Sequence, residues 1–313
     1  MKWIKKIVDF AAVEADAYDG RPTRFNTCFH SENEAPDKKP TSDAPYAYKR
    51  WLHLILASRN LAPDVVQKVT LSHSQARLIR NACNASIQIG RVNLTMAEDL
   101  NDEIVPALSA LRFPPEGLFV RLDACSPKDG AHKVPGKMSL HSVDEIVLRL
   151  VTSGRCRTAL EDCLGAMTPV ELCFLPFDER MGSEREFRVF CRTEDCRITG
   201  ISQYRWHKPW HYASFPTEDQ DNILQKVSLE AEKVRAQILD ELNGNDQTDR
   251  QLMEQGMSFD LFYDEQSHGV ELVELNPFGS RSPCGSCLFQ WVRDREVLYD
   301  EENKQITEFR VCW

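Results

Sequence analysis

Three oxygen-bearing side chains in the C-terminal third of the sequence have the spacing of a metal site. Glu274 and Asn276 are two positions apart in an alternating run, so both project from one face of a strand. Asp260 belongs to the preceding alternating run and can lie alongside them. Two carboxylates and an amide oxygen are hard ligands that suit Mg²⁺ shared with nucleotide phosphates. The alternative is a hairpin whose acidic residues simply face solvent.

The elements that carry these residues are two short strands. Residues 258–263 and 270–275 alternate between apolar and polar side chains, and a polar turn containing Gly269 separates them. This pattern predicts a β-hairpin, which brings the two strands side by side.

A second candidate site is a phosphate-binding corner near the middle of the chain. A Pro-Pro-Glu-Gly turn precedes a predicted strand at residues 118–122, and a Ser-Pro-Lys-Asp-Gly loop follows it at 126–130. Arg121 on that strand, beside hydroxyl and backbone donors of the loop, could hold a phosphate. The alternative is a surface turn with a solvated Arg121.

Further basic and amide side chains come from another predicted pair of strands, residues 186–191 and 197–203, joined by a polar turn at 193–195. Arg188 lies between Phe187 and Val189 and points to the face opposite those two. We therefore expect Arg188, Gln203 and Arg205 to meet on one face of the sheet.

Helices and one buried strand are predicted around these sites. Helical spacing covers 46–58 and 74–83, and a capping box at Ser142 and Glu145 begins a helix that runs to about 151. Residues 168–177 form an apolar run between prolines, which predicts a buried strand. Thr217 and Gln220 are expected to cap a long helix with one apolar stripe, followed by a polar loop at 245–250.

Composition limits the class of protein. The chain has 313 residues, 42% hydrophobic content and a net charge of −10, so it can bury a large core, and a broad surface that tracks nucleic-acid phosphates is not expected. No run has the apolar length of a membrane span, and the opening residues read as a short amphipathic start without a signal-peptide core. Residues 19–45 are rich in charged residues, Pro and Ser, and their central part, residues 30–45, has almost nothing to bury. The segment is expected to form a mobile loop or linker.

Eleven cysteines without a repeating spacing indicate reduced thiols in a cytosolic or nuclear protein, and we expect a cytoplasmic one. Cys284 and Cys287 form a close pair, and Cys191 and Cys196 a looser one. Zinc needs four ligands in a compact arrangement, and no second pair with metal-ligand spacing supplies them. Ordinary packing is therefore favoured over a metal or redox role.

Residues 204–212 interleave aromatic and basic side chains. Three interpretations remain open for this segment: base stacking on a nucleic acid, a lid or protein-contact loop, and simple packing. The acidity of the whole chain argues against the first.

Several of these segments, taken together and in order, resemble the cell division cycle protein 123 family. The matching stretches are FVRLDACSPKDG, SVDEIVLRL, VELCF, EFRVF, ITGISQ, FDLFYD, VELNPFG and LFQW, between about residues 113 and 291. The joint occurrence of EFR, GISQ and NPFG is much more specific than any single motif.

The resemblance implies an α+β, ATP-grasp-like fold, in which two lobes with mixed or antiparallel sheets flanked by helices hold ATP and Mg²⁺. It implies a variable segment at 1–45, an N-terminal lobe at 46–168 and a C-terminal lobe at 169–313. The metal ligands would be Asp260, Glu274 and Asn276. The residues expected to bind the nucleotide are Arg121, Ser126, Lys128, Leu172, Phe174, Arg188, Gln203 and Arg205.

Members of that family in eukaryotes promote assembly of translation initiation factor 2 by binding its γ subunit, so the resemblance implies a protein partner, with no nucleic acid and no membrane. Three departures from the family pattern fall near the nucleotide: Arg121 replaces a lysine, Leu175 and Pro176 replace a basic pair, and an SRSPCGSC stretch replaces a shorter acidic loop.

Two functional alternatives stay open beside the assembly factor. The general chemistry of the ATP-grasp fold would allow a ligase that activates a small carboxylate through an acyl phosphate. A third possibility is an interaction domain that has kept the scaffold and lost the nucleotide.

Overall fold

The computed structural model describes residues 2–18 and 23–313, which divide by their internal contacts into two compact units. Unit 1 comprises Met1–Asn60 and Arg180–Trp313, and unit 2 comprises Leu61–Glu179. The boundaries expected after residues 45 and 168 differ from this division. The first strand of the chain pairs with the last one, which places the expected variable segment within unit 1.

Among the described residues, six strands build the mixed sheet of unit 1, in the order β1-β9-β6-β5-β7-β8. The pairs β1–β9 and β9–β6 are parallel, and the pairs β6–β5, β5–β7 and β7–β8 are antiparallel. Both predicted antiparallel pairs are therefore confirmed. The bounds are β1 Trp3–Val8, β5 Glu186–Cys191, β6 Ile198–Gln203, β7 Met257–Asp264, β8 Gly269–Pro277 and β9 Thr307–Cys312.

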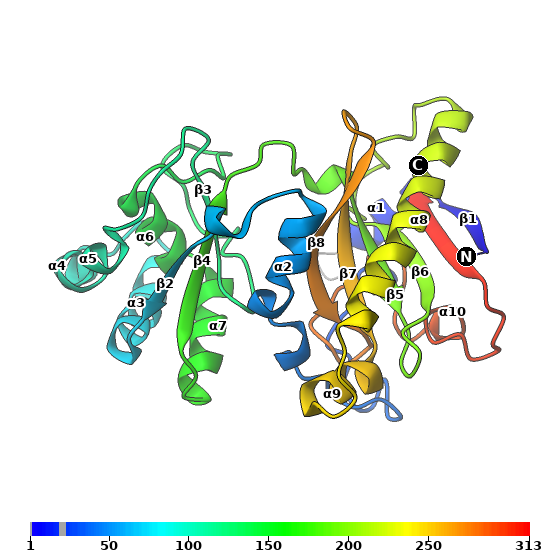
Figure 1. Ribbon diagram of the computed structural model, residues 1–313, viewed down its shortest axis with the longest axis horizontal. Helices are drawn as coiled ribbons and strands as arrows, with labels where there is room; N and C mark the ends of the chain where they lie inside the picture. Colours follow the sequence, from blue (N-terminus) through cyan, green and yellow to red (C-terminus); the bar gives the residue numbers. More distant parts are fainter. Residues whose placement is uncertain (1, 19–22) are drawn as a thin grey trace. The chain divides into compact units, whose positions relative to one another are not determined.

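The helices of unit 1 include two that pack against the β7–β8 hairpin, α2 and the long helix α8 (Figure 1). Aromatic and aliphatic side chains of α2 and α8 face inward and are buried. The bounds are α1 Phe10–Tyr18, η1 Ala44–Tyr46, α2 Tyr48–Ser58, η3 Ser183–Arg185, α8 Thr217–Asp240, α9 Gln247–Gln255 and α10 Arg295–Leu298.

Unit 2 is built on an antiparallel sheet with the strand order β2-β4-β3. Helices α3, α6 and α7 contact one another and share a hydrophobic core with this sheet. The predicted strand before Pro176 is confirmed as β4. The bounds are η2 Pro63–Val65, β2 Gln67–Leu71, α3 His73–Ser86, α4 Leu94–Glu103, α5 Val105–Leu108, β3 Leu118–Arg121, α6 Val143–Val151, α7 Gly154–Gly165 and β4 Val170–Pro176.

Two sequence predictions about element ends are wrong. Thr217 does not cap α8, because Pro216 precedes the helix without a side-chain cap, and Gln220 donates instead to the carbonyls of Ala213 and Phe215. Residues 247–250 are the start of α9, where Asp246 accepts hydrogen bonds from two backbone amides. The opening residues form strand β1 followed by a helix, because β9 offers them a pairing edge.

At α6, Ser142 caps as predicted, although the side chain of Glu145 bonds one residue earlier than a capping box requires.

The loop predicted at 19–45 has no helix or strand from 23 to 43, and residues 19–22 lie outside the described part. It is held by backbone hydrogen bonds to residues 280–287, for example from the Asn26 amide to the Cys287 carbonyl at 2.7 Å. Phe25 and Ala35 are buried. The expectation that residues 30–45 have almost nothing to bury is therefore wrong at Ala35.

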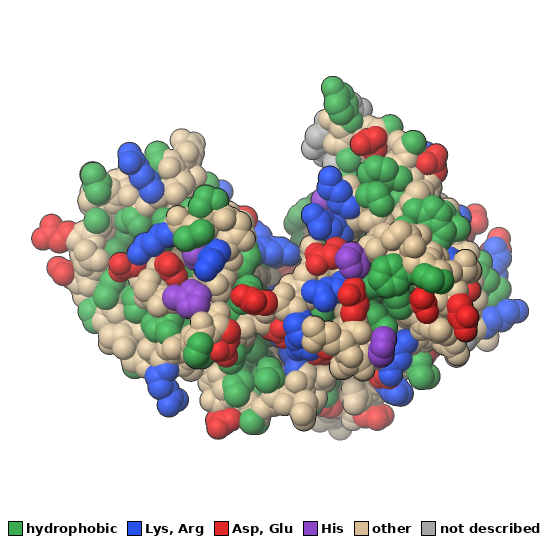
Figure 2. All heavy atoms as spheres, turned by 90° about the horizontal axis from the view of Figure 1, so that it is seen from above, with side chains coloured by type: hydrophobic (Ala, Val, Ile, Leu, Met, Phe, Trp, Pro, Cys, Tyr) green, Lys and Arg blue, Asp and Glu red, His purple; other side chains and the backbone are tan. Residues whose placement is uncertain are grey.

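Two further observations bear on partners. Within the described residues, no helix has both the length and the apolar character that crossing a membrane requires. On the face that Figure 2 shows, Lys and Arg side chains are interspersed with Asp and Glu and do not gather in one basic patch. That face therefore offers no extended surface for nucleic-acid phosphates.

Candidate functional site

The predicted metal residues lie on one face of the sheet in unit 1. Asp260 on β7 pairs directly with Glu274 on β8, and on its other side with Arg188 on β5. Side chains at directly paired positions project from the same face of a sheet, so these three form a row across neighbouring strands. Asn276 lies two residues beyond Glu274, and its Nδ2 is 3.3 Å from Asp260 Oδ2. The structure thus brings Asp260, Glu274 and Asn276 together with Arg188.

The centre of this row is a buried ion pair. Arg188 Nε and Nη2 donate to Asp260 Oδ1 and Oδ2, each at 2.7 Å, in a bidentate arrangement. Arg188 Nη1 also donates to the Gly285 carbonyl at 2.9 Å, and the guanidinium carbon lies 4.9 Å from the centre of the Tyr204 ring. Arg188 is 6% exposed and Asp260 is fully buried. Such charge-assisted bonds are short and strong, and they fix both side chains.

The Arg188 guanidinium keeps its charge in this buried position. Burial lowers the pKa of Arg188, but the Asp260 carboxylate raises it, and the net result is a pKa well above the usual range. These bonds use three of the five N–H groups of the guanidinium, which leaves two for a further acceptor. Arg188 therefore keeps only part of its hydrogen-bonding capacity for a phosphate.

The donors of this row fit Mg²⁺ by type. Among the described residues, no three or more His, Cys, Asp or Glu side chains gather as a metal site, so an ion here would need the amide oxygen of Asn276 and water as ligands. Mg²⁺ usually keeps several waters and binds through one or two carboxylates plus substrate phosphates. Glu274 and Asn276 are partly exposed, whereas Asp260 is buried against Arg188. Glu274 and Asn276 are therefore the ligands that an ion from solvent would reach first.

Cys284 and Cys287 border this cluster, but their chemistry is that of packed thiols. Both are buried, and burial raises the pKa of Cys284 to about 11 and raises that of Cys287 further. A thiol with a raised pKa is protonated near neutrality and is a poor nucleophile and metal ligand. The structure supports packing over a metal or redox role for this pair.

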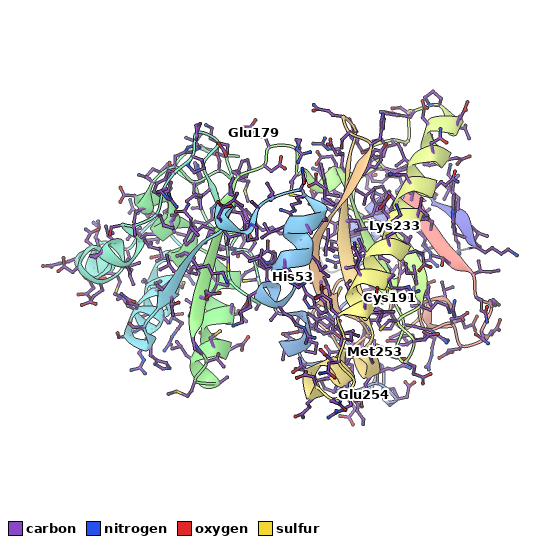
Figure 3. All side chains as sticks on the ribbon, in the orientation of Figure 1. His53, Glu179, Cys191, Lys233, Met253 and Glu254 are labelled. Carbon is purple, nitrogen blue, oxygen red and sulfur yellow. The ribbon has the colours of Figure 1, made fainter. Side chains whose placement is uncertain are left out.

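The looser cysteine pair is also part of the core. Figure 3 labels Cys191, the last residue of β5, and Met253 on α9. Cys196 Sγ lies 3.7 Å from Met253 Sδ, and burial raises the pKa of both Cys191 and Cys196. All eleven cysteines lie in the described part of the chain and are free thiols.

The prediction that Arg188, Gln203 and Arg205 meet on one face is wrong. In the β5–β6 pair Gln203 is opposite Phe187, whereas Arg188 is opposite Ser202, so Gln203 projects from the other face. Gln203 Nε2 donates to the carbonyls of Arg205 and Lys208, and its Oε1 accepts from the Cys312 amide. Gln203 therefore ties the segment after β6 to β9. Arg205 follows the strand, is exposed, and lies 3.7 Å from Glu184.

The aromatic segment at 204–212 is partly core. Trp210 and Tyr212 are buried, and Trp210 stacks on Trp313 with ring centres 6.0 Å apart. The packing interpretation is confirmed for these two residues. They are not accessible for stacking on nucleic-acid bases.

In unit 2 the predicted nucleotide residues lie on two faces of the small sheet. Leu172 and Phe174 belong to the hydrophobic core under the helices. Arg121 pairs with Cys173, the residue between them, so it projects from the opposite face. This placement does not support the predicted contacts of Leu172 and Phe174 with a cofactor, because their side chains are enclosed by the core.

The Ser-Pro-Lys-Asp-Gly loop is held by a residue that the sequence did not single out. Arg149 on α6 is 3% exposed and donates to the carbonyls of Lys128 and Lys137. Asp129 accepts from the Ser153 hydroxyl at 2.5 Å and the Arg155 amide at 3.2 Å, which ties the loop to the start of α7. Ser126 is buried and Lys128 is exposed. Only the apolar neighbours of Arg149 within a helix could have marked it as unusual.

Comparison with known proteins gives a consistent result. The D123 family model matches residues 84–312. The structure of Cdc123 from Schizosaccharomyces pombe is similar, with a TM-score of 0.56 and 16% identity, covering 87% of this chain and 99% of that one. A C-terminally truncated Cdc123 from the same organism has a TM-score of 0.54 and 17% identity, covering 91% and 99%. These matches show a shared fold, and the predicted α+β class is confirmed.

A third structure, D-Alanine-D-Alanine Ligase from Helicobacter pylori, has a TM-score of 0.32 and 15% identity over 65% of this chain and 55% of that one, too low a similarity to carry an inference. No curated protein matches the sequence.

Proposed function

This chain belongs to the D123 family, and from that premise we propose that it is an ATP–Mg²⁺-binding assembly factor that promotes assembly of eukaryotic translation initiation factor 2 by binding its γ subunit. The family match over residues 84–312 is the observation that carries the proposal. The similarity to two Cdc123 structures across most of both chains supports it at the level of fold. We expect the protein to act in the cytoplasm.

Unit 1 supplies the proposed metal ligands. Glu274 and Asn276 provide a carboxylate and an amide oxygen on one face, and Asp260 lies next to both. Bound there, Mg²⁺ would neutralise phosphate charge and orient a triphosphate. Because Asp260 is bonded to Arg188, its first role is to hold the guanidinium in place. Asp260 acts on the nucleotide mainly through the position of Arg188.

Arg188 is the proposed phosphate contact of unit 1. Its two remaining N–H groups can donate to a phosphate oxygen while the other three hold it against Asp260 and Gly285. An arginine fixed in this way loses little side-chain entropy when an anion binds. In unit 2 we assign nucleotide contacts to Arg121, Ser126 and Lys128, with Arg149 and Asp129 positioning the loop that carries the last two.

The partner is tested with the full chain and the isolated γ subunit. We expect the tagged chain to retain the γ subunit as a stable complex at micromolar concentrations of both proteins. Absence of a complex under these conditions, with both proteins folded, would remove the assembly function. The α subunit, added afterwards, should join the γ subunit faster in the presence of the chain, because promotion of joining is the proposed activity.

The ligase alternative stays a prediction without an observation that favours it over the assembly factor. Its direct test is the formation of ADP in the presence of a panel of amino acids and short peptides. An assembly factor that binds the nucleotide without transferring its phosphate gives no substrate-dependent ADP.

A further inference from the structure

A cavity of about 550 Å³ lies in unit 1 between the start of α8 and the tip of the β7–β8 hairpin. Its aromatic lining consists of Tyr212, Phe215 and Tyr263, and its charged lining includes Asp219, Glu265 and Lys226. Small-molecule sites in proteins commonly have volumes of about 300–1,000 Å³, so this cavity is large enough for a ligand. None of these residues belongs to the row of Arg188, Asp260 and Glu274.

The aromatic rings form two perpendicular contacts. The centre of the Tyr212 ring is 5.3 Å from that of Phe215, with an angle of 86° between the planes, and 5.8 Å from that of Tyr263, at 90°. The Tyr263 hydroxyl lies 2.9 Å from His268 Nδ1, which fixes that ring at the hairpin tip. Tyr212 and Tyr263 are buried, whereas Phe215 is 40% exposed. In such edge-to-face contacts the edge of one ring meets the face of the next, so Tyr212 fixes the positions of Phe215 and Tyr263.

The charged residues give this space a negative potential. Asp219, in the first turn of α8, forms no ion pair with any residue in the described ranges, and Glu265 lies 2.9 Å from His211. Burial and then the carboxylates of Glu265, Asp264 and Asp219 raise the pKa of Tyr263. Lys226 is the opposing charge, and it is paired with Glu230 at 3.2 Å. An anionic ligand would therefore face two carboxylates and only one ammonium group.

We propose that this cavity binds an organic cation, an alkylammonium or alkylguanidinium group whose charge lies near Asp219 and Glu265 and whose alkyl part packs on the exposed ring of Phe215, which the buried rings of Tyr212 and Tyr263 support. A cation over an aromatic face is attracted by the ring, and a carboxylate beside it adds a direct charge interaction. The same chemistry is available from a free amine and from a Lys or Arg side chain of a polypeptide. The proposal does not depend on the assembly function.

The test uses the full chain and two probes, agmatine as a free cation and an acetylated, amidated Gly-Arg-Gly peptide as a side-chain cation. Binding is measured by isothermal titration calorimetry at low salt. Asp219→Asn and Phe215→Leu should each weaken binding by about fivefold, since an exposed charge or cation–π contact contributes about 1 kcal/mol. Lys226→Gln should strengthen binding severalfold, because it removes the like charge. Glu218→Gln, exposed on the same turn of α8, is the matched control and should leave affinity unchanged.

The results distinguish the two possible sources of the cation and decide whether the proposal stands. Tighter binding of agmatine than of the peptide supports a free amine as ligand, and tighter binding of the peptide supports a protein side chain. The proposal is overturned if neither probe gives saturable binding up to millimolar concentration. It is also overturned if Asp219→Asn and Glu218→Gln weaken binding equally, which would mean diffuse surface attraction. Because ATP is not a probe in this assay, failure here leaves the nucleotide and assembly proposals unaffected.

Discussion

Asp260→Asn should destabilise unit 1 strongly. In the native chain both carboxylate oxygens of Asp260 accept hydrogen bonds from Arg188 at 2.7 Å, and the pair is almost completely buried. The substitution leaves a buried guanidinium opposite a neutral amide. Removing one partner of a buried ion pair costs about 3–5 kcal/mol, because the remaining charge stays buried and uncompensated. We expect a loss near the lower limit, about 3 kcal/mol, since the amide oxygen can still accept one hydrogen bond.

The position of the tryptophans makes this loss measurable for unit 1 alone. All six tryptophans of the sequence lie within the ranges of unit 1, so tryptophan fluorescence during urea unfolding reports that unit. With a urea m-value of about 2–3 kcal/mol/M, a loss of 3 kcal/mol lowers the unfolding midpoint by about 1–1.5 M. Lys233→Gln, which removes an exposed partner of Glu230 on α8, is the control and should change the free energy of unfolding by less than about 0.5 kcal/mol (Figure 3).

A double variant distinguishes the cost of an uncompensated buried charge from the cost of lost packing. Replacing both partners, as Arg188→Met with Asp260→Leu, removes the uncompensated charge and should cost much less than the sum of the two single substitutions. The reasoning is refuted if Asp260→Asn changes the midpoint no more than Lys233→Gln does. Simple additivity of the two single substitutions would also contradict it, because a bonded pair must show coupling.

Three other predictions follow from local geometry and pKa. Alkylation of the native protein at pH 8 should modify Cys28 well before Cys284, because Cys28 is exposed and Cys284 is buried. Burial raises the pKa of both thiols, that of Cys284 to about 11; mass spectrometry of timed samples decides the order, and equal rates would contradict it. Burial raises the pKa of Asp264, but hydrogen bonds and Arg180 lower it, and the net pKa is below the ordinary 3.8. The free energy of unfolding should therefore fall as the pH drops below about 4. Urea titration at several pH values should show a weaker fall for Asp264→Asn. Gly256→Ala should lose about 1–3 kcal/mol in the same titration, because φ is 73° and a Cβ would lie 2.7 Å from a carbonyl oxygen; an unchanged midpoint would refute this.

The sequence predicts the β7–β8 hairpin and the position of Asp260 alongside Glu274 and Asn276, because both depend on a short turn and on alternation. It also predicts the face of the strand from which the Arg188 side chain projects, because both neighbours in the strand are apolar. It does not predict that Asp260 bonds to Arg188. That contact requires β5 to lie beside β7, a pairing between segments about seventy residues apart that no local pattern encodes.

Other predictions fail where the local sequence pattern does not show which face of a strand a side chain occupies or which strand it pairs with. Strand β4 is buried on most of its length, so alternation does not mark its core face, and Leu172 and Phe174 could not be distinguished from residues on the face of Arg121. Strand β1 was missed because its pairing partner, β9, is at the other end of the sequence. Gln203 lies on the other face from Arg188 because the register of β5 with β6 places it opposite Phe187, and no local pattern in either strand sets that register.

Calorimetric titration of the full chain with ATP, with and without Mg²⁺, tests the central claim most directly. The proposed ligand Glu274 is partly exposed, so Glu274→Gln should leave the fold intact, and Glu254→Gln, an exposed glutamate on α9 labelled in Figure 3, is its control. We predict saturable binding that requires Mg²⁺, is weakened about tenfold or more by Glu274→Gln, and is unchanged by Glu254→Gln. No saturable binding of ATP by the folded parent chain, or equal binding by both variants, would contradict the account.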